Sequence, residues 1–405
     1  MTQKLAMSPA TCVLLLLATA SVGRAQQVYV VGSPAPGVFS QEIQPAVDAA
    51  TNGDVILVEN GSYYAGFTID GKGVSVVAAV DALVITGSAS IRNLATGQTV
   101  LLAGIWSGDG VGLSLQNNAG AIWIESCFLA GGTSDIMSFT GVSIVNCASV
   151  AIERCQIGGG WGPISGPLQD AAAGLEVANS NVAISDTTCR GGQGGQLHLQ
   201  PVLSCAGGPG ARIQSGSVFA SGTTFRGGDG GFAFPIPGAA PGGDGIVTFG
   251  AVSVVQCTFT GGLSGAGSTS PPGQPTVIGG AGTLDSLSHS ARHFAVTSLA
   301  REGQPIEVNA SGIVGESLGT LFSTSPASPQ LLASYDGSLL LSLANAGGLL
   351  LGDIGADGAL SITLIAPSLP VTVQAATFYL QSIFFDAPLT HVVVGPASAL
   401  VVIAL

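Results

Sequence analysis

A short glycine-containing motif returns five times along the middle of the chain. In each copy a Cys or Thr is followed two positions later by a mostly apolar residue, and Gly-Gly begins two positions after that. The copies are CFLAGG, CQIGGG, TTCRGG, TTFRGG and CTFTGG. The first glycines of these pairs stand at 131, 159, 191, 227 and 261, so the spacings are 28, 32, 36 and 34 residues. A repeat of this period is typical of a solenoid, whose units bury their apolar faces only by stacking on one another.

A second repeated segment lies upstream of each glycine pair. The segments GLSLQN, GVSIVN, GLEVAN, GARIQS and GIVTFG align without gaps, and apolar residues stand mostly at alternate positions after the glycine. This period of two predicts a short strand with one buried side. A further short strand follows in each unit, as in AIWIES and VAIERC. Two strands, a corner and a loop of variable length, all running in one direction, predict one coil of a parallel β-helix.

Asparagines recur at one position of this repeat. Asn117, Asn146 and Asn179 each stand five residues after the glycine that opens a segment. Stacked asparagines can pass hydrogen bonds from amide to amide, as side-chain ladders do in cross-β stacks. Alternatively, these residues act only as turn formers.

The glycine pairs themselves are interpreted as corners with unusual backbone angles. A phosphate-binding loop would need a Gly-Lys pair, and no lysine follows Lys72. A calcium-binding nonapeptide roll would need tandem nine-residue spacing, which the runs around Asp229 and Asp244 lack. We therefore expect no metal and no cofactor.

The first 25 residues resemble a secretory signal. Lys4 supplies the positive start, residues 13–17 form an apolar core, and small residues around Ala25 provide a cleavage site; a retained membrane anchor is the alternative. Cleavage changes the formal charge from −13 to 8 − 23 = −15, which argues against a nucleic-acid partner. No later stretch predicts a membrane span. We expect an extracellular or cell-surface protein with two domains, at 26–282 and 287–405.

Six cysteines remain after such cleavage, and an exported chain permits disulfides. Cys127 and Cys155 hold equivalent positions in consecutive coils, which is compatible with a disulfide or with stacked free thiols. Cys189 and Cys205 bracket a loop that a disulfide between them would staple. Both pairings are hypotheses, because six cysteines allow many connectivities.

The segment at 39–78 resembles the opening of the pectin-lyase-like, right-handed β-helix superfamily. It contains an amphipathic turn (Ile43, Val47, Ala50), then Gly53-Asp54 and an apolar strand. The resemblance extends over about 26–280. It implies a right-handed parallel β-helix whose open end is covered by the helical turn. The superfamily includes lyases, hydrolases, esterases, adhesins and inert stalks, so the resemblance does not select among these functions.

Residues from about 287 onward show alternating apolar runs between Gly, Pro, Ser and Asp, which predict a small antiparallel β-sandwich. Its segments GDIGADGALSITLIAP and FYLQSIFFD resemble a C-terminal module of large secreted bacterial proteins. The predicted fold is therefore all-β, a β-helix followed by a sandwich-like domain.

A small charged stripe is the candidate binding site. Arg190 and Arg226 stand immediately before Gly-Gly in adjacent coils, so they should lie about 4.8 Å apart. Asp186 and Asp229 are the nearest acids in sequence, and Trp161 lies on a glycine-rich loop where it could stack on a sugar. The stripe predicts contact with a carboxylated or sulfated sugar; alternatively both arginines point outward, paired by those acids.

These observations predict a secreted, non-catalytic β-helix protein with a structural or glycan-contacting role at an extracellular polysaccharide or cell surface. The alternative is a lyase or glycoside hydrolase that acts on an acidic polysaccharide. That alternative needs convergent titratable groups on one face, and no repeated acidic cluster is present to match the aspartates of such enzymes.

Overall fold

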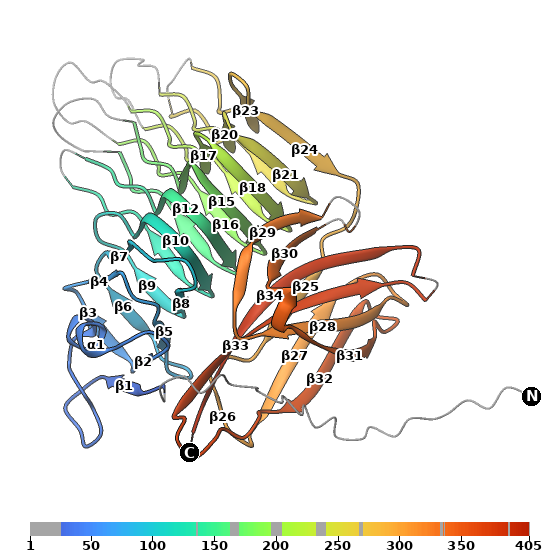
Figure 1. Ribbon diagram of the computed structural model, residues 1–405. Coiled ribbons are helices and arrows are strands. Elements are labelled where there is room, and N and C mark those ends of the chain that lie inside the picture. Colours follow the sequence, from blue (N-terminus) through green and yellow to red (C-terminus); the bar gives the residue numbers. More distant parts are fainter. Residues whose placement is uncertain are drawn as a thin grey trace, which may run out of the picture.

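The computed structural model describes residues 26–134, 137–162, 170–195, 205–231, 240–266, 270–332, 335, 337–387 and 389–404. The predicted signal segment, 1–25, lies outside the described residues. Figure 1 shows a stack of parallel strands, coloured blue to yellow, with an orange and red domain beside it. The fold is a parallel β-helix followed by a domain of antiparallel sheets, as the repeats predict.

Three parallel faces surround the β-helix core, and successive coils add one strand to each face in register. The first face consists of β4 (Phe67–Asp70), β7 (Ala89–Arg92), the first halves of β10 (Leu113–Glu125) and β12 (Val142–Glu153), β14 (Leu175–Ala178), β17 (Ala211–Ile213), β20 (Ile246–Thr248) and β23 (Thr276–Ile278). The second face consists of β1 (Val28–Val31), β2 (Val55–Val58), β5 (Ser75–Ala78), β8 (Thr99–Ala103), the second halves of β10 and β12, β15 (Ser180–Ser185), β18 (Gly216–Ser221), β21 (Ala251–Val255) and β24 (Thr283–Leu287). The third face consists of β3 (Gly61–Tyr63), β6 (Val84–Thr86), β9 (Ile105–Ser107), β11 (Phe128–Ala130), β13 (Gln156–Gly158), β16 (Thr188–Arg190), β19 (Thr224–Arg226) and β22 (Thr258–Thr260).

The core is built from columns of apolar side chains that the register stacks on one another. Leu115, Ile144, Val177 and Ile213 are paired residues of consecutive coils, and all four are fully buried. The helix α1 (Ile43–Ala49) covers the first coils and buries Ile43, Ala46 and Val47. This confirms the predicted amphipathic turn, which keeps the core and the first strand edges from water.

The corner between the first and second faces carries the predicted asparagine ladder. Asn117, Asn146 and Asn179 have φ values of 56°, 55° and 48°, in the left-handed region that asparagine tolerates better than most residues. The amide of Asn146 donates to Oδ1 of Asn117 at 3.0 Å, and the amide of Asn179 donates to Oδ1 of Asn146 at 2.9 Å. We call these three residues the asparagine corner.

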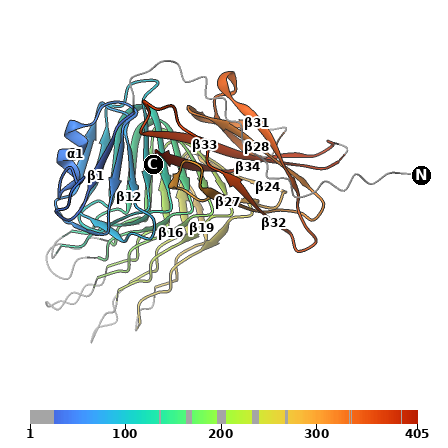
Figure 2. The same cartoon turned by 90° about the horizontal axis from the view of Figure 1, so that it is seen from below.

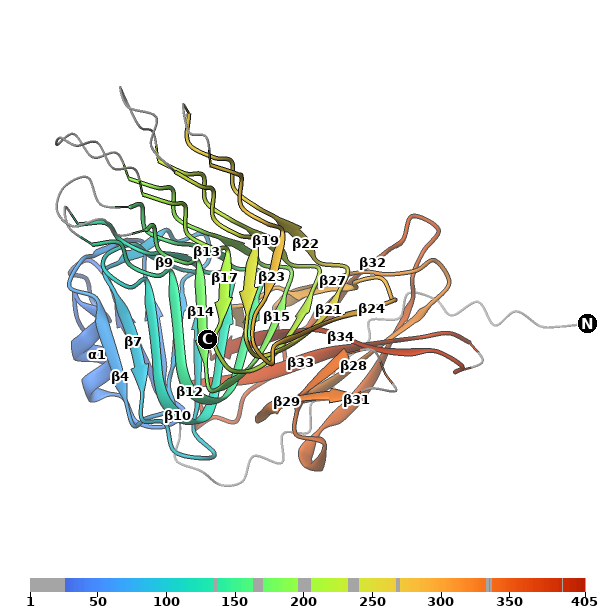
Figure 3. The same cartoon turned by 90° about the horizontal axis from the view of Figure 1, so that it is seen from above.

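The glycine-rich runs leave the coil between the third and first faces instead of turning a simple corner. We call them the glycine arms: outgoing arms at 159–162, 191–195, 227–231 and 261–265, and returning arms at 171–174, 206–210, 241–245 and 271–275. Figures 2 and 3 show them as parallel zigzag segments that project from one side of the stack. Within the described residues, no glycine of these arms has a positive φ. The prediction of unusual backbone angles is therefore wrong.

Many arm positions require glycine because neighbouring arms lie too close together there for a side chain. In the arm 191–195, Gly191 N donates to Arg226 O at the end of β19, on the next coil, and Gly192 N donates to Ala172 O on a returning arm. A Cβ on Gly192 would overlap the carbonyl oxygen of Gly160. Chains that bond to neighbours without strand pairing, with glycine where space is lacking, resemble the packed polyproline II chains of collagen, which have three residues per turn.

The C-terminal domain contains antiparallel sheets with their own apolar core, as predicted. Its elements are β25 (His293–Val296), β26 (Ala300–Arg301), β27 (Pro305–Ser311), β28 (Ser317–Ser323), β29 (Pro326–Leu332), β30 (Gly337–Leu341), η1 (Leu343–Asn345), β31 (Gly347–Asp353), β32 (Ala359–Ile365), β33 (Ala375–Phe385) and β34 (Val392–Ile403). It packs against the second face, where Trp123 contacts Tyr379 with ring centroids 4.9 Å apart. Strands buried on both sides explain the continuous apolar runs of this face.

Candidate functional site

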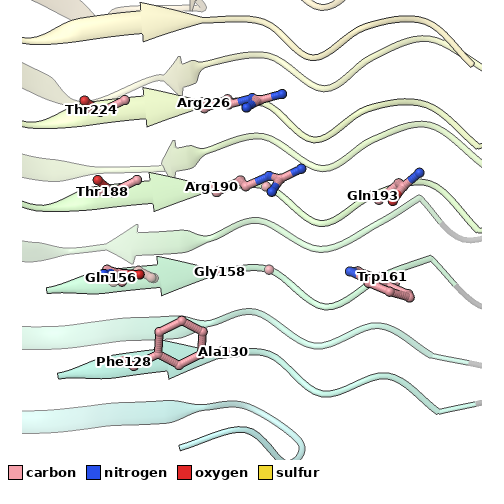
Figure 4. Close-up of a pocket in the computed structure, with 13 residues that line it drawn as sticks. Phe128, Ala130, Gln156, Gly158, Trp161, Thr188, Arg190, Gln193, Thr224 and Arg226 are labelled. Atoms are coloured by element: carbon pink, nitrogen blue, oxygen red, sulfur yellow. The ribbon is translucent and has the colours of Figure 1, made fainter. Parts of the chain in front are cut away.

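The outer surface of the third face and the adjoining arms form a groove of about 730 Å³. The groove is lined by strand residues and by residues of the outgoing arms (Figure 4). We call it the third-face groove; its lining includes Phe128, Ala130, Gln156, Gly158, Trp161, Thr188, Arg190, Gln193, Thr224 and Arg226. It contains three of the five residues predicted from sequence, Arg190, Arg226 and Trp161.

The register of the strands arranges the groove in columns. Gln156, Thr188 and Thr224 form one column of paired residues, and Arg190 pairs directly with Arg226 in the next column. Gly158 precedes Arg190 in that second column, and nothing lies within 4 Å of where its Cβ would be. The groove therefore stays open beside the two arginines.

The arms extend the groove with a three-residue period. Trp161 stands three residues after Gly158, and Gln193 three residues after Arg190. At a rise of 3.1 Å per residue, these side chains lie about 9 Å farther along the arms on the same side. Figure 4 shows Trp161 and Gln193 in this second row.

The two arginines concentrate positive charge in the groove. Within the described part of the chain, no carboxylate lies within 4.0 Å of Arg190. Arg226 has Asp229 3.9 Å away, but Asp229 also accepts the backbone N–H of Leu263 at 2.9 Å and thus belongs to the arm array. Two stacked cations with little neutralisation favour an anion between them.

Exposed aromatic rings lie beside these charges. The Trp161 side chain is 67% exposed. Phe128 stacks on Trp106 of the preceding coil, with ring centroids 4.9 Å apart and planes 28° apart. Sequence reasoning missed Phe128, although its place before the buried Leu129 marks it as outward-facing by the alternation of a strand.

Asp186 does not lie with the arginines. Its carboxylate is 2.6 Å from Nδ1 of His293, at the start of the C-terminal domain, and both line a separate hollow of about 300 Å³. The nearby carboxylate raises the pKa of His293. The predicted grouping of Asp186 with Arg190 fails because Asp186 occupies the corner between the second and third faces, at the opposite end of β16 from Arg190.

Five residues with positive φ form this second corner, and three of them meet the C-terminal domain. Their φ values range from 46° to 57°; they are Ser126, Arg154, Asp186, Gly222 and Gln256. Arg154 donates to Phe294 O at 2.7 Å and Gln256 accepts from Ala291 N at 2.8 Å. We call these five residues the docking corner.

Buried charges reinforce the contact at the docking corner. Glu125 pairs with Arg154 and accepts hydrogen bonds from Ser398 Oγ at 2.8 Å and Ala399 N at 2.7 Å. Glu153 is fully buried beside them, and burial raises its pKa well above the usual range. These glutamates stand inside apolar strand motifs, so sequence reasoning could not separate them from solvent-facing residues.

Neither predicted disulfide is formed, because Cys127, Cys155 and Cys189 are free cysteines. Cys127 and Cys155 are stacked thiols, the alternative for that pair: Cys127 N donates to Sγ of Cys155 at 3.4 Å. Cys189 points into the core between Ile157 and Phe225. Burial raises the pKa of the thiols of Cys155 and Cys189.

Among the described residues, no helix has the length and apolar character needed to cross a membrane. In the same residues, no group of three or more His, Cys, Asp or Glu side chains is arranged to hold a metal ion.

Comparisons with known proteins do not assign the chain to a family. No family model matches it, and no curated protein matches it. A solved structure, "Geobacillus virus E2 - ORF18", is similar over 91% of this chain and 86% of that chain, with 13% identity and a TM-score of 0.25. A TM-score this low carries no argument about fold or function.

Proposed function

We propose that this chain is a secreted, non-catalytic protein of the pectin-lyase-like β-helix type that binds an acidic polysaccharide in the third-face groove. The observation that carries the proposal is the direct pairing of Arg190 with Arg226 on the groove floor, with exposed aromatic rings alongside. Carboxylate or sulfate groups would bind to the guanidinium pair, since such charge-assisted hydrogen bonds are the strong ones. Sugar rings would stack on Trp161 and Phe128.

The groove supports binding of an extended chain. The strands from β11 to β19 are stacked at about 4.8 Å per coil, so the floor from Phe128 to Arg226 spans about 14 Å. Threonine and glutamine side chains along that floor supply neutral hydrogen-bond partners for hydroxyl groups. This arrangement combines the three contacts that sugars use, namely stacking, hydrogen bonding and charge pairing.

A binding screen tests the proposal. The full chain would be applied to an array of neutral, uronic and sulfated polysaccharides beside the variant Arg190→Ala/Arg226→Ala. We expect retention on anionic glycans, weakened roughly tenfold for each arginine removed. The matched control is Arg92→Ala/Arg212→Ala, because Arg92 and Arg212 are also exposed but pair with Asp70 and Glu176 on neighbouring coils. The proposal would be contradicted if the control variant lost as much glycan binding as Arg190→Ala/Arg226→Ala, or if the parent chain bound no anionic glycan.

The same incubations test the alternative of a lyase or hydrolase. Release of shorter saccharides by the parent chain, lost in Arg190→Ala/Arg226→Ala, would contradict the non-catalytic part of the proposal and place an active site in the groove.

A further inference from the structure

The strands of the third face carry charge on only two neighbouring coils. From β3 to β22, the only charged side chains within these strands are those of Arg190 and Arg226. Gly158 precedes Arg190 in the same column, and Thr260 follows Arg226. Asp229 lies 3.9 Å from Arg226 and offsets part of its charge. The strands of this face therefore provide cations for one acidic group and none for a second group on either adjoining coil.

An apolar column continues the groove floor toward the first coils. The register pairs Ile85 with Trp106, Trp106 with Phe128, and Phe128 with Gln156. Trp106 is 46% exposed and Phe128 is 36% exposed. The apolar faces of neutral sugars stack on such rings, whereas a carboxylate placed there would lose water without gaining a partner. This part of the column therefore favours neutral sugar units.

Hydroxyl side chains form the same column on the later coils (Figure 4). Thr188, Thr224 and Thr258 are paired residues of three consecutive coils. A threonine hydroxyl can both donate and accept a hydrogen bond, so these residues suit the hydroxyl groups of a neutral sugar. From Trp106 to Thr258 the column covers five steps of about 4.8 Å, or about 24 Å, which is long enough for several sugar units.

The charge of the whole chain acts in the same direction. Its formal net charge is −13, so the arginine pair is a local exception on an acidic molecule. A ligand with an acidic group on every sugar is repelled by this field along its whole length. A ligand with an isolated acidic group gains the contact with the arginine pair and meets little repulsion elsewhere.

We propose that the third-face groove recognises a mostly neutral polysaccharide with isolated acidic groups, and not a chain with an acidic group on every sugar. This inference rests on the proposed function and specifies its ligand. The acidic group binds between Arg190 and Arg226. Neutral units on one side of it stack on Phe128 and Trp106, and those on the other side bond to the threonine column.

Calorimetric titration of the full chain with three hexasaccharides tests this inference. The ligands are a β-linked glucose hexamer, the same hexamer with a single glucuronate at an inner position, and a hexamer of glucuronate alone. We expect the hexamer with one glucuronate to bind most tightly, about tenfold more tightly than either of the others, because only this ligand uses both the arginine pair and the neutral parts of the column.

Two variants separate the charged and the apolar contributions. Gly158→Arg adds a third cation beside Arg190, at a position where a Cβ meets nothing within 4 Å, and should strengthen binding of the glucuronate hexamer about tenfold. Trp106→Ala should weaken binding of the hexamer with one glucuronate about tenfold. Leu350→Ala is the matched control for the loss of an exposed apolar side chain, because Leu350 is 64% exposed on the C-terminal domain, and it should leave binding unchanged. A thermal unfolding curve checks that each variant is folded.

The outcomes distinguish this inference from the proposed function. A parent chain that binds the glucuronate hexamer as tightly as the hexamer with one glucuronate would overturn the inference and leave the proposed function standing. Undiminished binding of the hexamer with one glucuronate by folded Trp106→Ala would overturn the inference as well. If the parent chain bound neither acidic hexamer, both the inference and the proposed function would be wrong.

Discussion

The asparagine corner and the docking corner share one backbone conformation, but their side chains have different roles. Both hold residues with φ between 46° and 57°, stacked one coil apart. At the asparagine corner the side chains bond to each other along the stack. At the docking corner they bond to the C-terminal domain. The coil geometry thus determines the backbone angle, and the side chain at that angle remains free for another role.

The glycine arms are the contrasting case, because there the side chain is excluded by space instead of chosen for a contact. A corner needs a residue that tolerates a left-handed backbone, and glycine would satisfy it. A closely packed arm position, such as Gly192, needs a residue without Cβ although its φ is ordinary. Alanine should therefore be harmful at both places for different reasons: it strains the left-handed backbone of a corner, and it overlaps the neighbouring chain in an arm.

The largest expected effect concerns the docking corner. Arg154→Ala leaves Glu125 buried without its cationic partner, and removal of one member of a buried pair costs about 3 kcal/mol or more. Denaturant unfolding should show this loss. Arg92→Ala, at an exposed pair, should cost less than about 1 kcal/mol. Similar costs for the two variants would show that the docking corner is no more important than a surface ion pair.

Adding a methyl group in the arms should have the next largest effect. Gly192→Ala forces a Cβ onto the oxygen of Gly160, and overpacking of this kind costs about 2–3 kcal/mol. Gly158→Ala is the matched control, because its Cβ would meet nothing within 4 Å. The free energy of unfolding and hydrogen exchange of the arms would be compared. If both variants behave alike, close packing is not the reason for glycine in the arms.

The asparagine corner should respond to its backbone angle instead of to a lack of space. Asn146→Ala loses the ladder bonds and also strains a methyl-bearing residue at positive φ, which together cost about 2 kcal/mol. Asn146→Gly loses only the bonds and should cost about 1 kcal/mol. Equilibrium unfolding of both variants measures the difference. Glycine more harmful than alanine at this site would refute the backbone angle as the demand of the corner.

The smallest effect is a pH dependence at the docking corner. Because Asp186 raises the pKa of His293 above 6.5, their attraction stabilises the fold fully below pH 6.5 and is lost as pH rises through the folded pKa. The pair is partly exposed, so its contribution should be about 0.5 kcal/mol. The melting temperatures of the parent and His293→Gln would be compared from pH 5.5 to 9. A gap between them that does not narrow with rising pH would contradict this interpretation.

Features that repeat at a constant offset could be predicted from the sequence. The asparagine corner follows from three asparagines at one position of the repeat, and the pairing of Arg190 with Arg226 follows from their shared place before Gly-Gly. In a solenoid, equal positions in consecutive repeats become neighbours in space, so the sequence contains this information directly.

Features that depend on contacts between distant segments could not be predicted. Asp186 is close to Arg190 in sequence, but its partner is His293, which no repeat relates to it. The packing of the arms was also missed, because glycine indicates equally a special angle or a lack of space. Trp161 was placed on a loop correctly, whereas the role of its loop as one member of an ordered array depends on hydrogen bonds to other coils.

The three-residue period of the arms separates the glycines that pack against neighbouring arms from the side chains that face outward. The glycines of the outgoing arms have no room for a Cβ, but one position in each arm carries a side chain and is occupied in successive arms by Trp161, Gln193, Asp229 and Leu263. An aromatic, an amide, an acid and an aliphatic residue thus stand on identical backbone. Variation at Trp161, Gln193 and Leu263 could change what the protein recognises while its architecture stays constant, whereas the Asp229 side chain also bonds to the next arm at Leu263 N.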